Sequence, residues 1–79
     1  ITSIHGVDAE ILEFEVGENA KILKNQLRHL DFPKTAIVGG VIRQGKGIAV
    51  RGDFEFEAKD RVVVLSKPEC IKKVEGFFK

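Results

Sequence analysis

The short turns that separate the apolar segments after residue 35 constrain this chain most. Apolar stretches at 36–43, 48–50 and 62–65 are divided by brief polar segments that contain Gly or Asp. Strands joined by tight turns pair antiparallel, whereas a parallel pair needs a crossover of about a dozen residues or more. These segments therefore predict a mostly antiparallel sheet.

The first and the longest strand have different patterns. Residues 11–16 alternate between apolar side chains and Glu13 or Glu15, which indicates a strand with one wet face. Residues 36–43 are almost continuously apolar and predict an interior strand with both faces covered. Gly39 and Gly40 inside that segment predict a β-bulge or a close backbone approach.

The turn residues place three further strands. Residues 44–47 read as a hairpin turn, after which residues 48–50 return and Arg51 ends the strand. In this register residue 43 faces residue 48. A short strand follows at 54–57, where Phe alternates with Glu, and a turn at Lys59-Asp60 leads into a central strand at 62–65.

Two amphipathic helices are expected beside these strands. Asn19 is a candidate N-cap for a helix of about three turns, whose apolar stripe is Ala20, Leu23, Leu27 and Leu30. Pro33 ends it, because a residue before proline disfavours the helical conformation. Ser66 and Glu69 have the spacing of a capping box before a last helix, whose stripe is Cys70 or Ile71, Val74, Phe77 and Phe78. The expected fold is α+β, with the order β-α-β-β-β-β-α and helices packed on the sheet.

Composition limits the class of protein. Thirteen Lys and Arg against twelve Asp and Glu give a net charge of +1, which argues against a nucleic-acid binder. A hydrophobic content of 43% argues against a disordered tail, and no apolar run approaches the ~20 residues of a membrane span. We expect one domain at 10–79, preceded at 1–9 by a linker or edge strand. The absence of an initial Met suggests a piece of a larger protein.

No residue pattern supports catalysis or a metal site. A single cysteine, Cys70, excludes an internal disulfide, and two distant histidines, His5 and His29, do not complete a zinc site with it. The glycines at 45 and 47 lack the spacing of a phosphate loop and fit the hairpin turn better. Acidic residues beside the first strand are read as a solvated face. The chain is therefore not expected to be an enzyme.

Two arginines remain as candidates for binding an anion. Arg43 and Arg51 end the two strands of the expected hairpin, so they lie at opposite ends of the pair. Each could bind an anion where a second copy of the chain brings them together. The alternative is that both arginines only solvate strand ends.

The order of these motifs resembles that of the TrkA-C domain, also called RCK-C. The resemblance rests on Phe32-Pro33, the strand at 36–43, Gly52-Asp53, Asp60 before the strand at 62–65, and the ending at 71–78. It covers roughly residues 10–79. Lys59-Asp60 stands where the family has a second Gly-Asp, although glycine adopts a positive φ more easily.

The resemblance implies a regulatory lobe of a TrkA-type potassium uptake protein, cytoplasmic and peripheral to the inner face of the membrane. It implies pairing with a second copy, attachment to the rest of the TrkA-type protein, and a membrane potassium transporter as partner. Some relatives bind a small ligand such as cyclic di-AMP. NAD or ATP would belong to a Rossmann lobe outside this sequence, so no cofactor is expected here. A purely structural dimerisation lobe, or the same lobe on another ion transporter, are the alternatives.

Three expectations follow for the structure. The first is a two-fold homodimer, because so small a domain buries little core alone. The second is that Phe14, Leu23, Leu27, Val63 and Val74 are among the most buried residues. The third is a ligand site formed by apolar strand residues, glycines and the two arginines: Ile37, Val38, Gly39, Gly40, Arg43 and Arg51.

Overall fold

The fold is built on a five-stranded sheet with the strand order β1-β2-β5-β3-β4. The computed structural model describes residues 2–3 and 8–79. Its strands are β1 (Thr2–Ser3), β2 (Glu10–Glu15), β3 (Ala36–Arg43), β4 (Lys46–Ile48) and β5 (Arg61–Ser66). Every neighbouring pair is antiparallel, as the short turns predict. The central position of β5 is confirmed.

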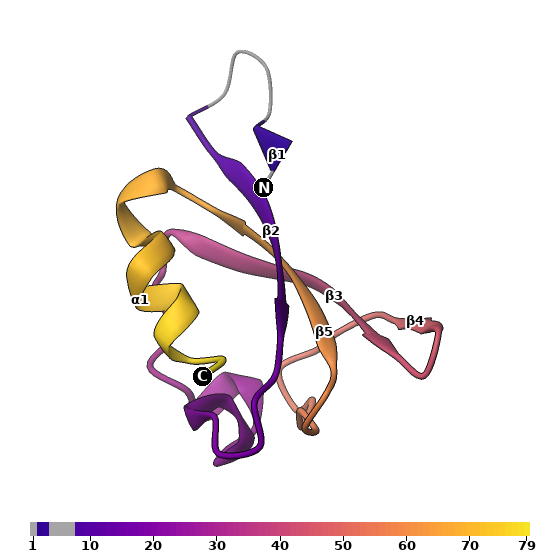
Figure 1. Cartoon of the computed structure of the whole chain (residues 1–79). Coiled ribbons are helices and arrows are strands. Elements are labelled where there is room, and N and C mark those ends of the chain that lie inside the picture. Colours follow the sequence, from indigo (N-terminus) through magenta and orange to yellow (C-terminus); the bar gives the residue numbers. More distant parts are fainter. Residues whose placement is uncertain (1, 4–7) are drawn as a thin grey trace.

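Short helical segments connect and close the sheet. They are the 3-10 turns η1 (Lys21–Leu23), η2 (Leu27–His29) and η3 (Pro68–Cys70), followed by the helix α1 (Ile71–Gly76). Figure 1 shows α1 in yellow and the purple segment with η1 and η2 on the same side of the sheet. The α+β class is therefore confirmed, with one face of the sheet covered.

The core lies between that covered face and the helical segments. The following residues form it: Val16, Ala20, Ile22, Ala36, Val41, Phe56, Val62, Val64, Val74 and Phe78. Phe14 stacks on Phe78 with ring centroids 4.8 Å apart, so the first long strand contacts the end of the chain. The amide of Gly17 also donates to the carbonyl of Phe78. A Cβ on Gly17 would lie 3.2 Å from that carbonyl oxygen, so this approach requires glycine.

The predicted three-turn helix at 20–30 is wrong. Ala20 and Gln26 have extended backbones, with ψ of 144° and 154°, and split the segment into η1 and η2. The amides of Ile22, Leu27 and Arg28 donate instead to the carbonyls of Phe77, Phe54 and Gly52. Hydrogen bonds to distant segments thus replace the bonds that a helix would make four residues back.

This change alters the core that the sequence predicted. Ile22 is fully buried, whereas Leu23 and Leu27 only pack against the core from its margin. Phe14 is also half-buried, and Val74 is buried as predicted. Val63 was expected in the core, but it lies outside the cluster because its neighbours Val62 and Val64 occupy the covered face.

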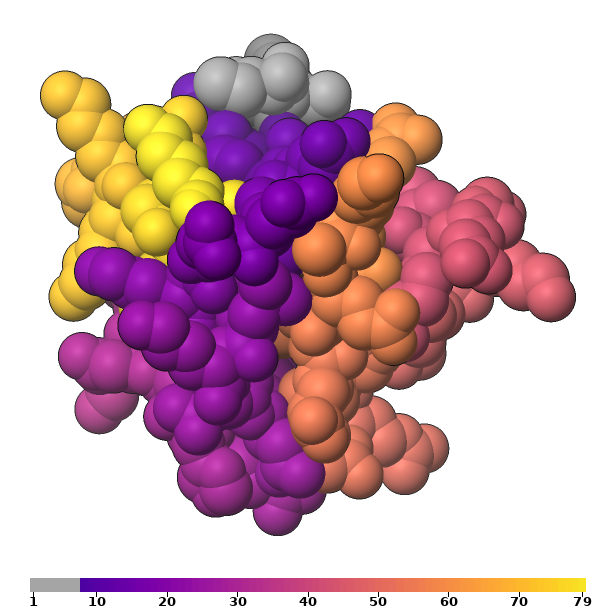
Figure 2. All heavy atoms as spheres, turned by 60° about the horizontal axis from the view of Figure 1, so that its bottom comes forward, coloured from indigo at the N-terminus to yellow at the C-terminus, as the bar shows by residue number. Residues whose placement is uncertain are grey.

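The hairpin after β3 is tighter than predicted. Gln44 and Gly45 both have positive φ, and Arg43 pairs with Lys46, not with residue 48. The returning strand is therefore Lys46–Ile48 and does not extend to residue 50. The hairpin projects from one side of the molecule (Figure 2).

Two other local predictions need correction. Residues 54–57 form no strand, although Phe56 is buried within the segment that we call the 49–60 loop. The proposed capping box fails, because the Ser66 hydroxyl donates to the Lys67 carbonyl and η3 has no side-chain cap. Of the linker or edge strand expected at 1–9, residues 1 and 4–7 lie outside the described residues.

The β-bulge prediction is confirmed, and the register locates it. Val38 pairs with Val64, and Gly40 pairs with Val63, so an extra residue enters β3 at Gly39. Within a single chain only one face of this strand is covered, because Ile37 keeps 62% of its surface exposed. The uncovered side of the sheet therefore offers the surface on which a site can form.

Candidate functional site

The face of the sheet turned away from α1 carries a cross-strand row of apolar side chains. We call this the outer face. Leu65 on the central strand β5 pairs with Ile11 of β2 on one side and with Ile37 of β3 on the other. Residues that oppose each other in antiparallel strands project to the same side. Ile11 and Ile37 are 37% and 62% exposed, so the row faces solvent in a single copy.

The outer face is apolar beyond this row. Val63 and Ile42 lie on the same side by register, because Val63 pairs with Glu13 and Ile42 pairs with Arg61. Neither residue belongs to the core among the residues that the structure describes. Glu13, the cross-strand neighbour of Val63, forms a salt bridge of 2.6 Å with Arg61 on this same face. The outer face thus carries a charged pair beside its apolar row.

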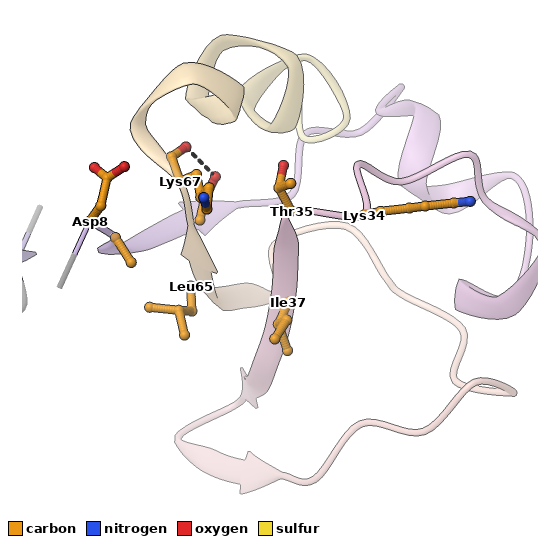
Figure 3. Close-up of a pocket in the computed structure, with 8 residues that line it drawn as sticks. Asp8, Lys34, Thr35, Ile37, Leu65 and Lys67 are labelled. Atoms are coloured by element: carbon orange, nitrogen blue, oxygen red, sulfur yellow. Dashed lines mark hydrogen bonds between the residues drawn. The ribbon is translucent and has the colours of Figure 1, made fainter.

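A hollow of about 230 Å³ opens at the end of the face where β3 begins and β5 ends. Its lining residues are Asp8, Ala9, Lys34, Thr35, Ile37, Leu65, Ser66 and Lys67. Figure 3 shows Ile37 and Leu65 side by side on neighbouring strands and pointing the same way. Asp8 stands at the opposite end of the hollow from Lys34 in this view.

Two lysines and one carboxylate, that of Asp8, line this hollow. Lys34 precedes β3 and Lys67 follows β5, and antiparallel pairing brings these strand ends together. The amide of Lys67 donates to the carbonyl of Thr35, which fixes the two ends beside each other. Both lysines are exposed, and neither forms a salt bridge within the described part of the chain. An apolar floor with free ammonium groups suits an anionic ligand that carries a ring system.

The predicted site residues fall in separate places. Ile37 lines the hollow, while Val38 packs against the core on the covered side. Gly39 and Gly40 form the bulge in the middle of β3. Arg43 lies at the far end of that strand, and the exposed Arg51 lies in the 49–60 loop. The structure thus places only Ile37 at the hollow.

Arg43 has partners within its own chain. Its Nε and Nη2 each donate to Asp60 at 2.8 Å, a bidentate pair. Its Nη2 also donates to the carbonyl of Glu55, and its Nη1 lies 3.0 Å from Glu57. The guanidinium carbon stands 5.2 Å from the centre of the Phe54 ring. Arg43 therefore fastens the 49–60 loop to the end of β3.

Asp60 is the buried half of this pair, with 2% of its surface exposed. Burial alone would raise the pKa of its carboxyl group, but hydrogen bonds from Arg43 and from the Glu57 amide, together with the charge of Arg43, outweigh it and hold the pKa below the ordinary 3.8. The hydrogen bond with Asp60 in turn raises the pKa of Arg43. The Arg43–Asp60 pair is thus fully charged near neutral pH.

Sequence reasoning missed Lys34 and Lys67. The sequence did contain a signal for them, because Lys34 precedes one apolar strand and Lys67 follows another. Antiparallel pairing places the start of one strand beside the end of its neighbour. The expectation that Arg43 and Arg51 were the available cations came from their place at strand ends. It did not account for Asp60, which directly precedes the adjacent strand β5.

Neither a metal cluster nor a membrane-spanning helix is found in the described residues. No group of three or more His, Cys, Asp or Glu side chains in residues 2–3 and 8–79 is placed to hold a metal ion. No helix in this part of the chain has the length and apolarity to cross a membrane.

The fold and the open apolar face define a small α+β domain, and comparisons identify its family. A sequence model of the TrkA-C domain matches residues 11–79. The chain belongs to the TrkA-C domain family. A solved structure named "Structure of RCK domain with cda" superposes with a TM-score of 0.76 at 23% identity, covering 87% of this chain and 97% of the other, and thus shares the fold.

Curated relatives are named as potassium uptake proteins. The Trk system potassium uptake protein TrkA homolog 1 of Methanosarcina mazei is 38% identical over the whole chain, which covers 18% of that protein. The Trk system potassium uptake protein TrkA of Azorhizobium caulinodans is 34% identical over 70 residues, 89% of this chain and 15% of that protein. The chain therefore spans less than a fifth of the length of these relatives.

Proposed function

We propose that this chain is the regulatory domain of a TrkA-type potassium uptake protein, and that it binds a small anionic ligand and pairs with a second copy of itself. The observation that carries the proposal is the apolar hollow beside two unpaired lysines on an uncovered sheet face. Membership of the TrkA-C family and the names of the relatives support the potassium uptake role. In the full assembly the domain would be cytoplasmic and peripheral to the membrane, with a potassium transporter as partner.

The size of the hollow favours a site shared by two copies. At about 230 Å³ it is smaller than the ~300–1,000 Å³ of pockets that enclose a drug-sized ligand. Two such hollows facing each other would reach that range. A symmetric ligand with two phosphates would then meet Lys34 and Lys67 from each copy.

Cyclic di-AMP is our candidate for this ligand. It is a two-fold symmetric dianion with two adenine rings, so its phosphates suit the lysines and its rings suit the apolar floor of Ile37 and Leu65. The similar RCK domain structure is itself named as one "with cda". The sequence-based prediction of Val38, Gly39, Gly40, Arg43 and Arg51 as ligand residues stays a prediction. The hollow adds Lys34 and Lys67 as candidate ligand residues.

Calorimetric titration tests the ligand. Cyclic di-AMP is added to the parent chain and to Lys67→Ala, with AMP as a control ligand and Lys72→Ala, an exposed lysine of α1, as a matched control variant. Charge-assisted hydrogen bonds contribute about 1.5–3 kcal/mol each, so Lys67→Ala should weaken binding about 10- to 100-fold and Lys72→Ala should not. Arg51→Ala tests the sequence-based site in the same series.

Failure to bind below about millimolar concentration would favour the structural dimerisation lobe instead. Equal binding by the parent and by Lys67→Ala would move the site away from the hollow. Sedimentation equilibrium of the unliganded chain tests dimerisation separately from the ligand.

A further inference from the structure

The 49–60 loop contains a short segment, residues 51–57, that lies outside the sheet. We call this segment the strap. It forms no strand, and Phe56 is its one buried residue. Segments with few buried contacts and exposed hydrogen bonds open locally at a lower free energy than the whole domain. What holds the strap in place therefore decides how easily it opens.

Backbone hydrogen bonds join the first part of the strap to η2. The amide of Arg28 donates to the carbonyl of Gly52 at 2.7 Å, and the amide of Leu27 donates to the carbonyl of Phe54 at 3.0 Å. The side chain of Arg28 packs on Gly52, since a Cβ added to this glycine would meet the Arg28 Cβ at 3.3 Å and its Nε at 3.5 Å. Glycine at position 52 thus allows η2 to approach the strap closely.

The side chain of Arg43 joins the strap to β3. Its Nη2 donates to the carbonyl of Glu55 at 3.2 Å, its Nη1 lies 3.0 Å from Glu57, and its guanidinium carbon lies over the ring of Phe54. The Glu57 side chain is 66% exposed, so its ion pair is screened by solvent. The bidentate pair of Arg43 with the buried Asp60 lies beyond the strap. Arg43 therefore binds Asp60 firmly and the strap weakly.

We propose that the strap opens and closes as one unit, latched by Arg43, while the sheet stays folded. Opening breaks the exposed contacts of Arg43 and both backbone bonds to η2 together, because the three accepting carbonyls all lie on this short segment. Asp60 keeps its pair with Arg43 and its backbone bond with Val16, so it is the fixed base of the strap. The strap acts within a single chain, without ligand or second copy.

The strap in this form couples two parts of the fold that are distant in sequence. η2 is attached to it through two amides, and the end of β3, with the hairpin that follows, is attached through Arg43. A contact that holds the strap closed at η2 should also hold it closed at Arg43. The reverse holds equally, because the coupling free energy between two sites is reciprocal.

Amide hydrogen exchange, followed by NMR at increasing sub-denaturing urea, tests local opening. The urea slope of an opening free energy scales with the surface that the opening exposes. The amides of Leu27 and Arg28 should therefore share one opening free energy with a small slope. The amides of Val62 and Val64 in β5 should be better protected and show the steep slope of global unfolding. Equal slopes in both pairs would overturn the proposal, because η2 would then open only when the whole domain unfolds.

Glu57→Gln tests the latch. Loss of an exposed ion pair should speed exchange at Leu27 and Arg28 about 2- to 4-fold. Glu55→Gln is the matched control, because the Glu55 side chain forms no ion pair in residues 2–3 and 8–79. It should leave exchange at η2 unchanged. No acceleration in Glu57→Gln, or the same acceleration in Glu55→Gln, would show that η2 opens without the latch and would overturn it.

Gly52→Ala tests whether the strap is one unit. The added Cβ displaces Arg28 slightly, so it should speed exchange at Arg28 and, by the same factor, at Leu27. Gly47→Ala is the control, because nothing lies within 4 Å of a Cβ added there. It should leave both amides unchanged. Acceleration at Arg28 alone would mean that the two hydrogen bonds break separately, which contradicts opening as a unit.

Discussion

The two faces of the sheet carry similar residues but have different surroundings. Val62, Val63 and Val64 follow one another on β5, yet Val62 and Val64 are completely buried while Val63 stays outside the core. The difference comes from what covers each face, since α1 and the 3-10 turns lie on one side alone. Alternate residues of a strand thus belong to two distinct faces of the sheet. Apolar residues on the uncovered face indicate a surface that a ligand or another chain can cover.

The largest expected effect concerns the buried end of the covered face, where β5 begins. Arg43→Ala removes the partner of the buried Asp60 and leaves its carboxylate unpaired. Loss of one partner of a buried ion pair costs about 3–5 kcal/mol, so the free energy of unfolding should fall by that amount. Urea denaturation at a fixed protein concentration measures it. A loss below about 1 kcal/mol would mean that solvent replaces Arg43 easily.

The next prediction compares an isoleucine from each side. Ile22→Ala empties a fully buried position and should cost about 2–5 kcal/mol of unfolding free energy. Ile37→Ala removes an exposed side chain and should change monomer stability by no more than about 0.5 kcal/mol. Denaturation at dilute protein concentration makes the comparison. Similar losses in the two variants would show that the outer face is already covered in a single chain.

Acidic pH should lower the free energy of unfolding through protonation of Asp60. The folded pKa of its carboxyl group lies below the unfolded value of 3.8, so its contribution to stability is complete above that value. The contribution is lost as the pH falls through the folded pKa. The resulting decrease in the free energy of unfolding should be smaller than the decrease caused by Arg43→Ala, because a protonated Asp60 keeps part of its hydrogen bonding. Thermal denaturation from pH 5 to pH 2 measures it, and Asp60→Asn should flatten that dependence.

The smallest expected effect is at the turn that enters β5. Lys59 has a φ of 73°, a left-handed conformation that costs a residue with a side chain about 1–2 kcal/mol. Lys59→Gly relieves this strain but adds freedom to the unfolded chain, so it should raise stability by about 0.5–1 kcal/mol. Thermal denaturation detects the change. Lys46→Gly, within β4, should not raise stability, since glycine weakens a strand.

Local pattern predicted most of the sheet but not its helical cover, and it failed at residues 54–57 and in the hairpin register. Tight turns gave the antiparallel strands, and the paired glycines gave the bulge in β3. The segment at 20–30 has the period of a helix, but its amides bond to carbonyls contributed by the 49–60 loop and by the end of the chain. Such long-range hydrogen bonds leave no signal in the local sequence. They override the helix propensity of this segment, so the sequence alone does not reveal the change.

Only part of the candidate site could be predicted, because the rest also depends on contacts between segments far apart in the sequence. Ile37 was found because an apolar strand is visible in the sequence. The lysines were missed because Lys34 and Lys67 become neighbours only when β3 and β5 pair. Arg43 was taken as free because its partner Asp60 is seventeen residues away in sequence. Charge at a strand end is thus a weak guide until the opposite strand end is known.

The stacking of Phe14 on Phe78 also bears on the order of events during synthesis. Residues near one end of the domain contact residues near the other, so the core cannot close while the last helix is still inside the ribosome. Until then the strands already synthesised have unpaired edges and exposed apolar side chains, the features that invite aggregation. The domain can therefore complete its folding only after residue 78 has emerged from the ribosome.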